Sequence, residues 1–234
     1  LGNSTEAVSA VITRKAITVT ASADDSESIV YGNDVTIVYD ADLAEGDQVG
    51  TDARINGATS TSGFYVAGVH SISKGAFSIV DANDDDVTDN YDITFRGTDF
   101  NIAKRALHIA SGITALDKQY NNRTDAELDL SGAAFTVGDV IDGDTVTLNQ
   151  SVYNAAFADK NVQFDDDGNV VAQTVTITGL VLNAEGDGSN YDLVMPEGGW
   201  TTTASITPKE LTSGSVIWNR VALYYNGEDQ SAAI

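Results

Sequence analysis

The sequence predicts an all-β protein built from tandem immunoglobulin-like β-sandwich domains. Short runs alternate apolar with polar residues, and Asp, Asn and Gly bound these runs. Period-two runs rich in Val, Ile, Thr and Tyr are typical of half-buried strands. The acidic residues comprise 27 Asp and 8 Glu, and Asp favours turns whereas Glu favours helices. Many short strands without helices between them favour sandwiches or partial barrels.

The first half of the chain carries a clear alternating run at residues 34–40. Val35, Ile37 and Tyr39 fall on one face of this run, because successive side chains of a strand point to opposite faces. The other strands expected in this half span residues 77–80 and 91–95.

The second half repeats the same pattern at residues 144–148 and 173–178. In the later run Val175 and Ile177 lie opposite three threonines, as in a strand with one buried face. The Asp-Gly pair within residues 164–170 predicts a hairpin. Gly179 interrupts the alternation and predicts a β-bulge.

Composition and charge exclude several classes of function. The chain has 234 residues and a net charge of −23, with 12 Lys and Arg against 35 Asp and Glu. Nucleic acid and anionic lipid both need a basic surface, so neither partner is expected. Without Cys there are no disulfides and no thiolate chemistry. The chain contains no run of 18 apolar residues, so no membrane span is predicted, and residues 1–11 show no signal-peptide pattern.

Several motifs recur along the chain in the same order. An opening segment is followed 18 or 19 residues later by a Tyr near an Asn. The opening segments are residues 12–17, 102–107 and 206–211, and the tyrosines are Tyr31, Tyr120 and Tyr225. Later elements also recur, at residues 46–49 and 143–146 and at residues 90–93 and 190–193. The spacing of about 100 residues matches an immunoglobulin-like domain.

The repeats predict the domain organisation. Residues 12–101 form one β-sandwich repeat and residues 102–205 form a second, longer one. Residues 1–11 are expected to be the last strand of a preceding repeat. Residues 206–234 are expected to begin a further repeat, as part of a longer tandem array. Alternatively, the terminal segments complete each other's sheets within one chain or between chains.

Basic residues are concentrated where the predicted repeats join. One interpretation is that they lie in short solvated linkers. The other is that they pair with Asp-rich loops of the neighbouring domain and set the angle between domains. The five residues are Arg14, Lys15, Lys104, Arg105 and Lys209.

The motifs together resemble two related bacterial repeats over nearly all of residues 12–212. Residues 158–162, 175–180, 190–191 and 206–209 resemble the YDG repeat. Residues 30–33, 67–72 and 89–95 are similar to the "mostly bacterial immunoglobulin-like" (MBG) repeat. The second repeat departs from the family pattern at residues 119–122, which read Gln-Tyr-Asn-Asn instead of containing Tyr-Asp-Gly.

The resemblance implies a β-sandwich repeat of large secreted surface proteins. In adhesins and filamentous-haemagglutinin-like proteins such repeats serve mainly as spacers. We therefore expect structural extender or stalk repeats of a secreted or cell-surface bacterial adhesin, located outside the cell. The expected partners are neighbouring repeats of the same chain, with self-association as a further expectation.

Two other classes of function remain open from the sequence. A glycan- or protein-binding module would need exposed aromatic rings, although Trp and Tyr are more often core residues. A strand-exchanging subunit of an extracellular filament or surface layer would use residues 206–234 to extend a neighbour's sheet. The aromatic candidates are Tyr153, Trp200, Trp218, Tyr224 and Tyr225.

Acidic loops suggest calcium as a ligand. Ca²⁺ prefers six to eight oxygen ligands, which alternate Asp and Asn residues on a tight turn can supply. The alternative is a polar turn between two strands. Counted from Asp81, the sixth residue of the loop is Asp86, where a calcium-binding loop has Gly, and no helices flank the loop. The first candidate site comprises Asp81, Asn83, Asp85, Asp89 and Asp92, and the second comprises Asp165, Asp167 and Asn169. A third acidic cluster contains Asp139, Asp142 and Asp144.

No pattern in the sequence predicts catalysis. There is no Gly-x-Ser-x-Gly motif, no P-loop and no Gly-x-Gly-x-x-Gly motif. His70 and His108 have no partner that the sequence identifies. Carboxylates are so abundant that pairs of them do not indicate a glycosidase. The chain is therefore not expected to be an enzyme.

Overall fold

The computed structural model describes residues 11–24 and 28–211. These residues contain eighteen strands, two 3₁₀ turns and no α-helix, which confirms the predicted all-β class. None of the described residues belongs to a helix that is long and apolar enough to span a membrane.

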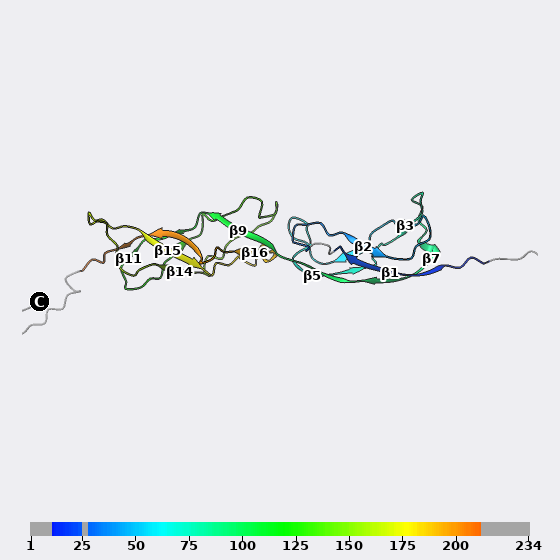
Figure 1. Cartoon of the computed structure of the whole chain (residues 1–234), viewed down its shortest axis with the longest axis horizontal. Helices are drawn as coiled ribbons and strands as arrows, with labels where there is room; N and C mark the ends of the chain where they lie inside the picture. Colours follow the sequence, from blue (N-terminus) through cyan, green and yellow to red (C-terminus); the bar gives the residue numbers. More distant parts are fainter. Residues whose placement is uncertain (1–10, 25–27, 212–234) are drawn as a thin grey trace, which may run out of the picture. The chain divides into compact units, whose positions relative to one another are not determined.

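The chain divides into two compact units. Unit 1 comprises Leu1–Gly112, Ala133–Val152 and Leu180–Met195, and unit 2 comprises the remainder. The predicted boundaries of the repeats, at residues 101 and 205, stay predictions. In Figure 1, β1 lies beside β2 in unit 1, and β14 lies beside β15 in unit 2.

Unit 1 is organised around its first strand, in which alternate residues are buried. β1 is antiparallel to β2 and parallel to β7, and its buried face comprises Ile17, Val19, Ala21 and Ala23. This sheet has the order β2-β1-β7. Its strands are β1 (Lys15–Ala23), β2 (Ile37–Asp40) and β7 (Tyr91–Gly97).

A second antiparallel sheet of unit 1 has the order β4-β5-β8. Its Ile72 packs with Val19 of the first sheet, with Phe77 and with Ile79 in one buried cluster. The strands are β4 (Arg54–Asn56), β5 (Gly68–Ser73) and β8 (Asp99–Ile102), and a short pair joins β3 (Gln48–Val49) to β6 (Ile79–Val80).

The third main sheet of unit 1 repeats the parallel pairing of β1 with β7. β9 pairs in parallel with β16 from Arg105↔Tyr191 to Val194↔His108, as β1 pairs with β7 from Lys15↔Tyr91. A 3₁₀ turn precedes the second strand in both cases, at Thr88–Asn90 and Gly188–Asn190. The strands are β9 (Arg105–Ser111), β13 (Ala134–Phe135) and β16 (Tyr191–Val194).

The described residues of unit 2 contain one three-stranded antiparallel sheet and two short pairs. In β15, Gln173, Val175 and Ile177 are buried while the three threonines are exposed, as the alternation predicts. The sheet comprises β14 (Asn154–Phe157), β15 (Gln173–Thr178) and β17 (Trp200–Ala204). The pairs are β10 (Thr114–Ala115) with β12 (Leu128–Asp129), and β11 (Lys118–Gln119) with β18 (Ile206–Thr207).

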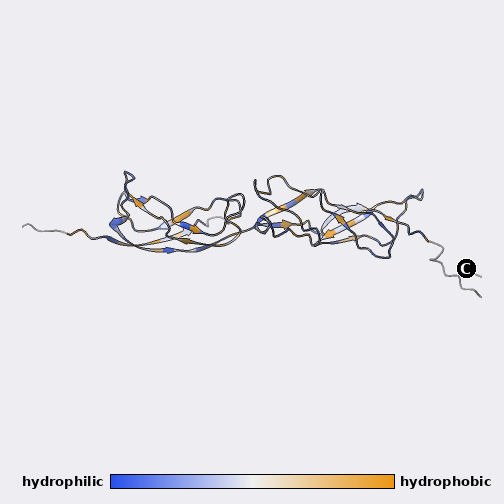
Figure 2. Cartoon of the chain, turned by 180° about the vertical axis from the view of Figure 1, so that it is seen from behind, coloured by the Kyte–Doolittle hydropathy of each residue, from blue (hydrophilic) through white to orange (hydrophobic). Residues whose placement is uncertain are grey.

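Alternation is visible throughout the described chain. Figure 2 shows hydrophilic and hydrophobic residues interleaved along the strands instead of separated into blocks. Val35, Ile37 and Tyr39 are all half-buried on one side of their segment, whereas Val38 and Asp40 are exposed. The predicted one-sided burial of residues 34–40 is therefore confirmed.

Three local predictions differ from the structure. Residues 144–148 form no strand ladder; they make one isolated bridge, Leu148↔Leu182, and irregularly spaced backbone hydrogen bonds to residues 181–187. The strand expected at residues 77–80 is shortened to β6, Ile79–Val80. Gly179 has a φ of +68° and follows the last residue of β15, so it ends the strand and forms no bulge.

Candidate functional site

The two candidate calcium loops are hairpin turns of one type. The N–H of Asp81 donates to the carbonyl of Asp85, and the N–H of Asp165 donates to the carbonyl of Asn169, both at 3.0 Å. The fourth residue of each turn has a left-handed φ, +65° at Asp84 and +81° at Gly168. Together with the bridge between Phe164 and Val170, this geometry confirms the hairpin predicted at residues 164–170.

The first carboxylate of each turn accepts backbone N–H groups. Asp81 Oδ1 accepts from Asn83 at 2.8 Å and from Asp85 at 3.0 Å. Asp165 Oδ1 accepts from Asp167 at 3.1 Å and from Asn169 at 2.7 Å. These backbone bonds lower the pKa of Asp81 and, with the Asn169 amide, that of Asp165, because they favour the ionised form. The carboxylates thus cap their own turns.

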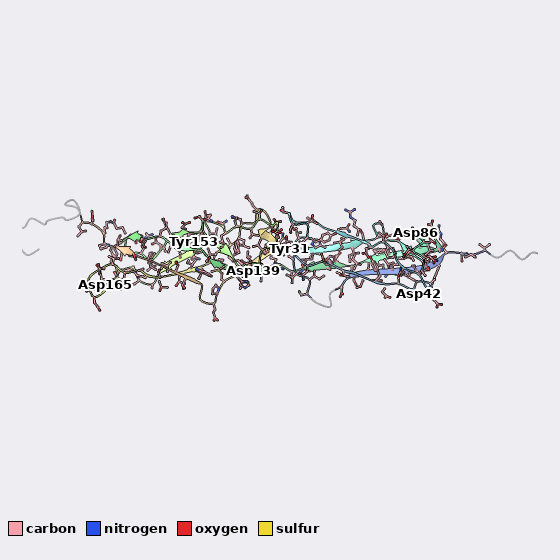
Figure 3. All side chains as sticks on the ribbon, turned by 90° about the horizontal axis from the view of Figure 1, so that it is seen from above. Tyr31, Asp42, Asp86, Asp139, Tyr153 and Asp165 are labelled. Atoms are coloured by element: carbon pink, nitrogen blue, oxygen red, sulfur yellow. The ribbon has the colours of Figure 1, made fainter. Side chains whose placement is uncertain are left out.

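The remaining members of the first calcium candidate lie outside this turn. Asp89 is on the 3₁₀ turn, 3.9 Å from Arg14, and Asp92 is on an exposed position of β7. Within residues 11–24 and 28–211, no three His, Cys, Asp or Glu side chains are grouped as a metal site. Figure 3 shows Asp86 and Asp165 at the surface of units 1 and 2 respectively. Calcium binding stays a hypothesis, which the turn geometry does not require.

A buried carboxylate–tyrosine junction in unit 1 is the best-built polar site among the described residues. Asp144 Oδ2 accepts the hydroxyl groups of Tyr31 and Tyr191, each at 2.6 Å. Both tyrosines are almost fully buried, and their rings meet edge to face with centroids 5.3 Å apart. The Tyr191 hydroxyl also accepts the N–H of Ile141 at 2.9 Å. Segments more than 100 residues apart are joined in this way.

A second carboxylate reinforces the junction. Asp187 accepts the N–H groups of Thr61 at 3.1 Å and of Thr145 at 3.0 Å, and only 4% of its surface is exposed. Asn190 accepts the N–H of Ala67 at 3.0 Å. Burial raises the pKa of Asp187, but the two N–H donors outweigh burial and lower it overall.

Burial and hydrogen bonding to Asp144 raise the pKa values of Tyr31 and Tyr191. The reason is that both factors disfavour a phenolate beside a carboxylate. Each hydroxyl therefore remains a proton donor to Asp144. In the part of the chain that the structure describes, the other oxygen, Oδ1, is buried without a hydrogen-bond partner. Burying this oxygen without a hydrogen bond costs free energy of desolvation, and the two short hydrogen bonds to Oδ2 offset that cost.

The same local arrangement occurs once more in unit 1. The Tyr91 hydroxyl donates to Asp47 and accepts the N–H of Ala44 at 2.9 Å, as Tyr191 does with Asp144 and Ile141. The sequence contains the signal for this pairing, because the elements at residues 46–49 and 143–146 recur together with those at residues 90–93 and 190–193. The alternation of apolar and polar residues does not identify these tyrosine–aspartate pairs, because Asp47 and Asp144 lie in turns and not in strands.

Most of the basic residues at the predicted junctions pair within their own predicted repeat. Lys15 lies 3.1 Å from Asp42, and Lys104 lies 3.5 Å from Asp192. Arg105 donates to the carbonyl of Asp139 at 2.9 Å. These three contacts do not join the predicted repeats 12–101 and 102–205 to one another, and the boundaries of those repeats stay predictions.

The two histidines have partners that the sequence did not identify. His108 Nδ1 lies 2.8 Å from Asp139, and this bond lowers the pKa of Asp139. His70 is buried between the rings of Tyr65 and Phe100, and its Nε2 lies 2.7 Å from the carbonyl of Val66. His70 thus packs within the apolar interior, and His108 fixes a loop.

The aromatic candidates for glycan binding are not free platforms where the structure describes them. Trp200 is half-buried on β17, opposite Ile177. Tyr153 is half-buried, and its hydroxyl accepts the N–H of Leu128 at 3.3 Å (Figure 3). Trp218, Tyr224 and Tyr225 lie outside the described residues.

Comparisons with known proteins add no family assignment. No protein-family model matches the chain, and no curated protein or solved structure is significantly similar to it.

Proposed function

We propose that this chain forms structural extender repeats in the stalk of a secreted or cell-surface bacterial adhesin. The observation that carries the proposal is the parallel ladder between β1 and β7. Seven consecutive residue pairs, from Lys15↔Tyr91 to Ala21↔Gly97, hold these strands together. The β9–β16 pair repeats the arrangement over four residue pairs.

A parallel ladder at the start of a unit suits a chain that carries tension. A force applied before β1 and after β7 acts along both strands in opposite directions. The hydrogen bonds between the strands are then loaded together in shear and must break at once. The buried face of β1, with Val19 and Ala21 fully inaccessible, adds the cost of exposing apolar surface.

The tyrosine junction supports the same role. Asp144 and Asp187 fix the segments around Tyr31 and Thr61 through hydrogen bonds, and Tyr31 packs with Ile102 and Leu107 in one buried cluster. Extender repeats need such fixed joints, because a flexible linker would let the stalk fold back on itself.

The proposal can be tested by pulling single molecules in two directions. The chain has no Cys, so pairs of cysteines can be introduced as attachment points. Handles at Arg14→Cys and Asp99→Cys load the β1–β7 ladder in shear. Handles at Arg14→Cys and Asn90→Cys pull the two strands apart from one end of the ladder, so that its residue pairs separate one after another, because Lys15↔Tyr91 is the first pair. All three positions are exposed.

We expect the shear geometry to require a clearly higher unfolding force than the end-loaded geometry in the same protein. Equally low forces in both geometries would contradict the extender role. The end-loaded variant is the matched control, since it has the same fold and one of the same cysteines.

Calcium stiffening is a separate part of the proposal. A melt in EDTA is compared with melts in millimolar calcium and magnesium. At about 100 times its dissociation constant, a ligand adds about 2.7 kcal/mol, which for a domain of about 100 residues raises Tm by roughly 10–20 °C. A calcium-specific rise that is lost in Asp81→Ala and Asp85→Ala would support a site. Equal small rises with both cations would leave these carboxylates as turn caps only.

A further inference from the structure

We infer that the surface around Asp47 and Tyr91 is a docking site for the tip around Tyr120 of a second copy of this chain. The acceptor surface is defined by residues 44–47 and Tyr91, and the Tyr120 tip by residues 118–123. The inference rests on the proposed extender role, because it gives the partner and the contact by which such repeats join.

The acceptor surface has the local geometry of the occupied junction. The N–H of Asp47 donates to the carbonyl of Ala44, and the N–H of Asp144 donates to the carbonyl of Ile141, at 3.1 and 3.0 Å. Tyr91 and Tyr191 hold the two turns in the same way. Within the described residues, however, Asp144 accepts two tyrosine hydroxyls, whereas Asp47 accepts only that of Tyr91.

A hollow lies where the second tyrosine would enter. Its volume is about 590 Å³. Arg14, Lys15, Ala44, Asp47, Asp89 and Tyr91 line it. A phenol ring entering this space can reach the Asp47 carboxylate.

Up to the tyrosine, the Tyr120 tip is paired as the Tyr31 tip of the occupied junction is. Beyond the tyrosine the two tips differ, because the left-handed residue is Gly32 (φ +90°), directly after Tyr31, but Asn122 (φ +63°), two residues after Tyr120. Tyr31 donates its N–H to the carbonyl of Ala103 at 2.8 Å, and Tyr120 donates its N–H to that of Thr207 at 2.9 Å. Val30, which precedes Tyr31, forms a parallel bridge to Ala103, and Gln119, which precedes Tyr120, pairs in parallel with Thr207. The Tyr120 side chain is only half-buried, and its hydroxyl has a long 3.3 Å contact with Asn122.

Side-chain sizes at the two contacts are complementary. In the occupied junction Gly32 follows Tyr31, and a Cβ there would lie 2.5 Å from Ile141 Cδ1. In the Tyr120 tip the following residue is Asn121, which needs more space. The acceptor surface provides that space, since exposed Ala44 occupies the position of Ile141.

Charges also favour this occupant. The Tyr120 tip carries Lys118 and Arg123, and Lys160 donates to Asn122 at 2.9 Å. The acceptor surface carries Glu45 and Asp47, and its hollow is also lined by Asp89 and by the basic Arg14 and Lys15, so acidic groups outnumber basic ones there. Opposite charges steer two surfaces together and fix their register. Because basic residues also line the hollow, we expect weak association, which NMR can detect.

Two different surfaces of the chain form the proposed contact. Such a heterologous contact does not close on itself unless a ring forms, so copies add one after another. Because donor and acceptor are separate, each can be blocked without changing the other. An isotope-labelled Tyr120→Ser chain, which keeps its acceptor, is titrated with an unlabelled Ala44→Ile chain, which keeps its tip.

We expect amide shifts in the labelled chain at residues 44–47 and at Tyr91. Tyr120→Phe in the unlabelled chain should weaken binding about tenfold, because it removes one hydrogen bond to a carboxylate. Size exchange supplies the matched control. A labelled Ala44→Ile chain should not bind the Asn121 tip, but should bind a tip carrying Asn121→Gly, because this change removes the side chain that would meet the larger residue at position 44.

Shifts elsewhere, shifts that are unchanged by Tyr120→Phe, or no shifts at millimolar concentration would overturn the inference. These outcomes are distinguishable from failure of the extender role, because the pulling experiment measures ladders within one chain. A chain that resists shear but does not dock would keep the proposed function and lose this contact.

Discussion

Asp144 is the residue on which the polar junction depends. Its Oδ2 accepts two tyrosine hydroxyls at 2.6 Å in a buried setting. Tyr191→Phe removes one of these bonds and also the acceptor for the Ile141 N–H. Since a hydrogen bond to a charged group contributes about 1.5–3 kcal/mol, we expect unit 1 to lose about 2 kcal/mol of stability.

Urea unfolding followed by circular dichroism measures this loss, and hydrogen exchange at Ile141 localises it. Tyr120→Phe is the matched control, because its hydroxyl makes only the 3.3 Å contact with Asn122. A loss of less than about 0.5 kcal/mol for Tyr191→Phe would place the junction's stability in its apolar packing.

Asp187 predicts a pH dependence. Its pKa is lowered overall by the Thr145 and Thr61 N–H groups, so the folded state favours the carboxylate. A lowered folded pKa contributes stability that is present above the unfolded value, 3.8, and is lost as pH falls through the folded value. Asp187→Asn should therefore destabilise the protein at pH 7, and the difference from the unmodified chain should shrink below about pH 4. Urea unfolding at both pH values tests this, and a difference independent of pH would contradict it.

The hairpin turns provide a prediction at the scale of an element. Asp84 and Gly168 occupy the same left-handed position of two turns with equivalent hydrogen bonds. A non-glycine residue there has a steric cost, although Asp tolerates it better than most. Asp84→Gly should stabilise unit 1 by up to about 1 kcal/mol, and Gly168→Asp should destabilise unit 2 by a similar amount.

Thermal melts of the two variants measure these opposite effects. Asp86→Gly serves as a control beside the first turn, because Asp86 does not occupy the left-handed position. Stabilisation by Asp86→Gly as large as by Asp84→Gly would show that loss of charge, and not backbone conformation, is responsible.

Alternation of apolar and polar residues predicts which face of a strand is buried, but not whether the segment forms a strand ladder. It correctly predicts the buried face of β15 and the side of residues 34–40 that faces inward. It fails at residues 144–148, where apolar residues alternate but the backbone pairs irregularly with residues 181–187. Burial needs only one apolar face, whereas a ladder also needs a partner strand in register.

The charge of the whole molecule predicts its response to salt. A net charge of −23 on 234 residues destabilises the compact state through repulsion. Raising the ionic strength from about 0.01 M to about 0.15 M shortens the Debye length from about 30 Å to about 8 Å. We expect Tm to rise by roughly 5 °C as repulsion is screened.

Sodium chloride and choline chloride at equal ionic strength separate screening from specific cation binding. Equal rises in Tm would show screening, as we expect. A rise with sodium alone, or a fall in both salts, would contradict repulsion as the cause.

The sequence by itself determined the all-β class and the buried faces of individual strands. Both follow from local rules, because a period of two and the turn preferences of Asp and Gly act over a few residues. Recurring motifs also marked Tyr31, Asp47 and Asp144 as elements of a pattern. The two calcium candidates were only partly predictable, since the same residues fit a metal loop and a capped turn.

Only the tertiary structure decided which of these residues meet. Tyr31 and Asp144 are separated by 113 positions, and no local rule relates them. The parallel pairing of β1 with β7 is likewise a contact between segments distant in sequence. Such contacts depend on how complete sheets pack and on which polar groups remain to be satisfied inside, and those conditions exist only once the chain is folded.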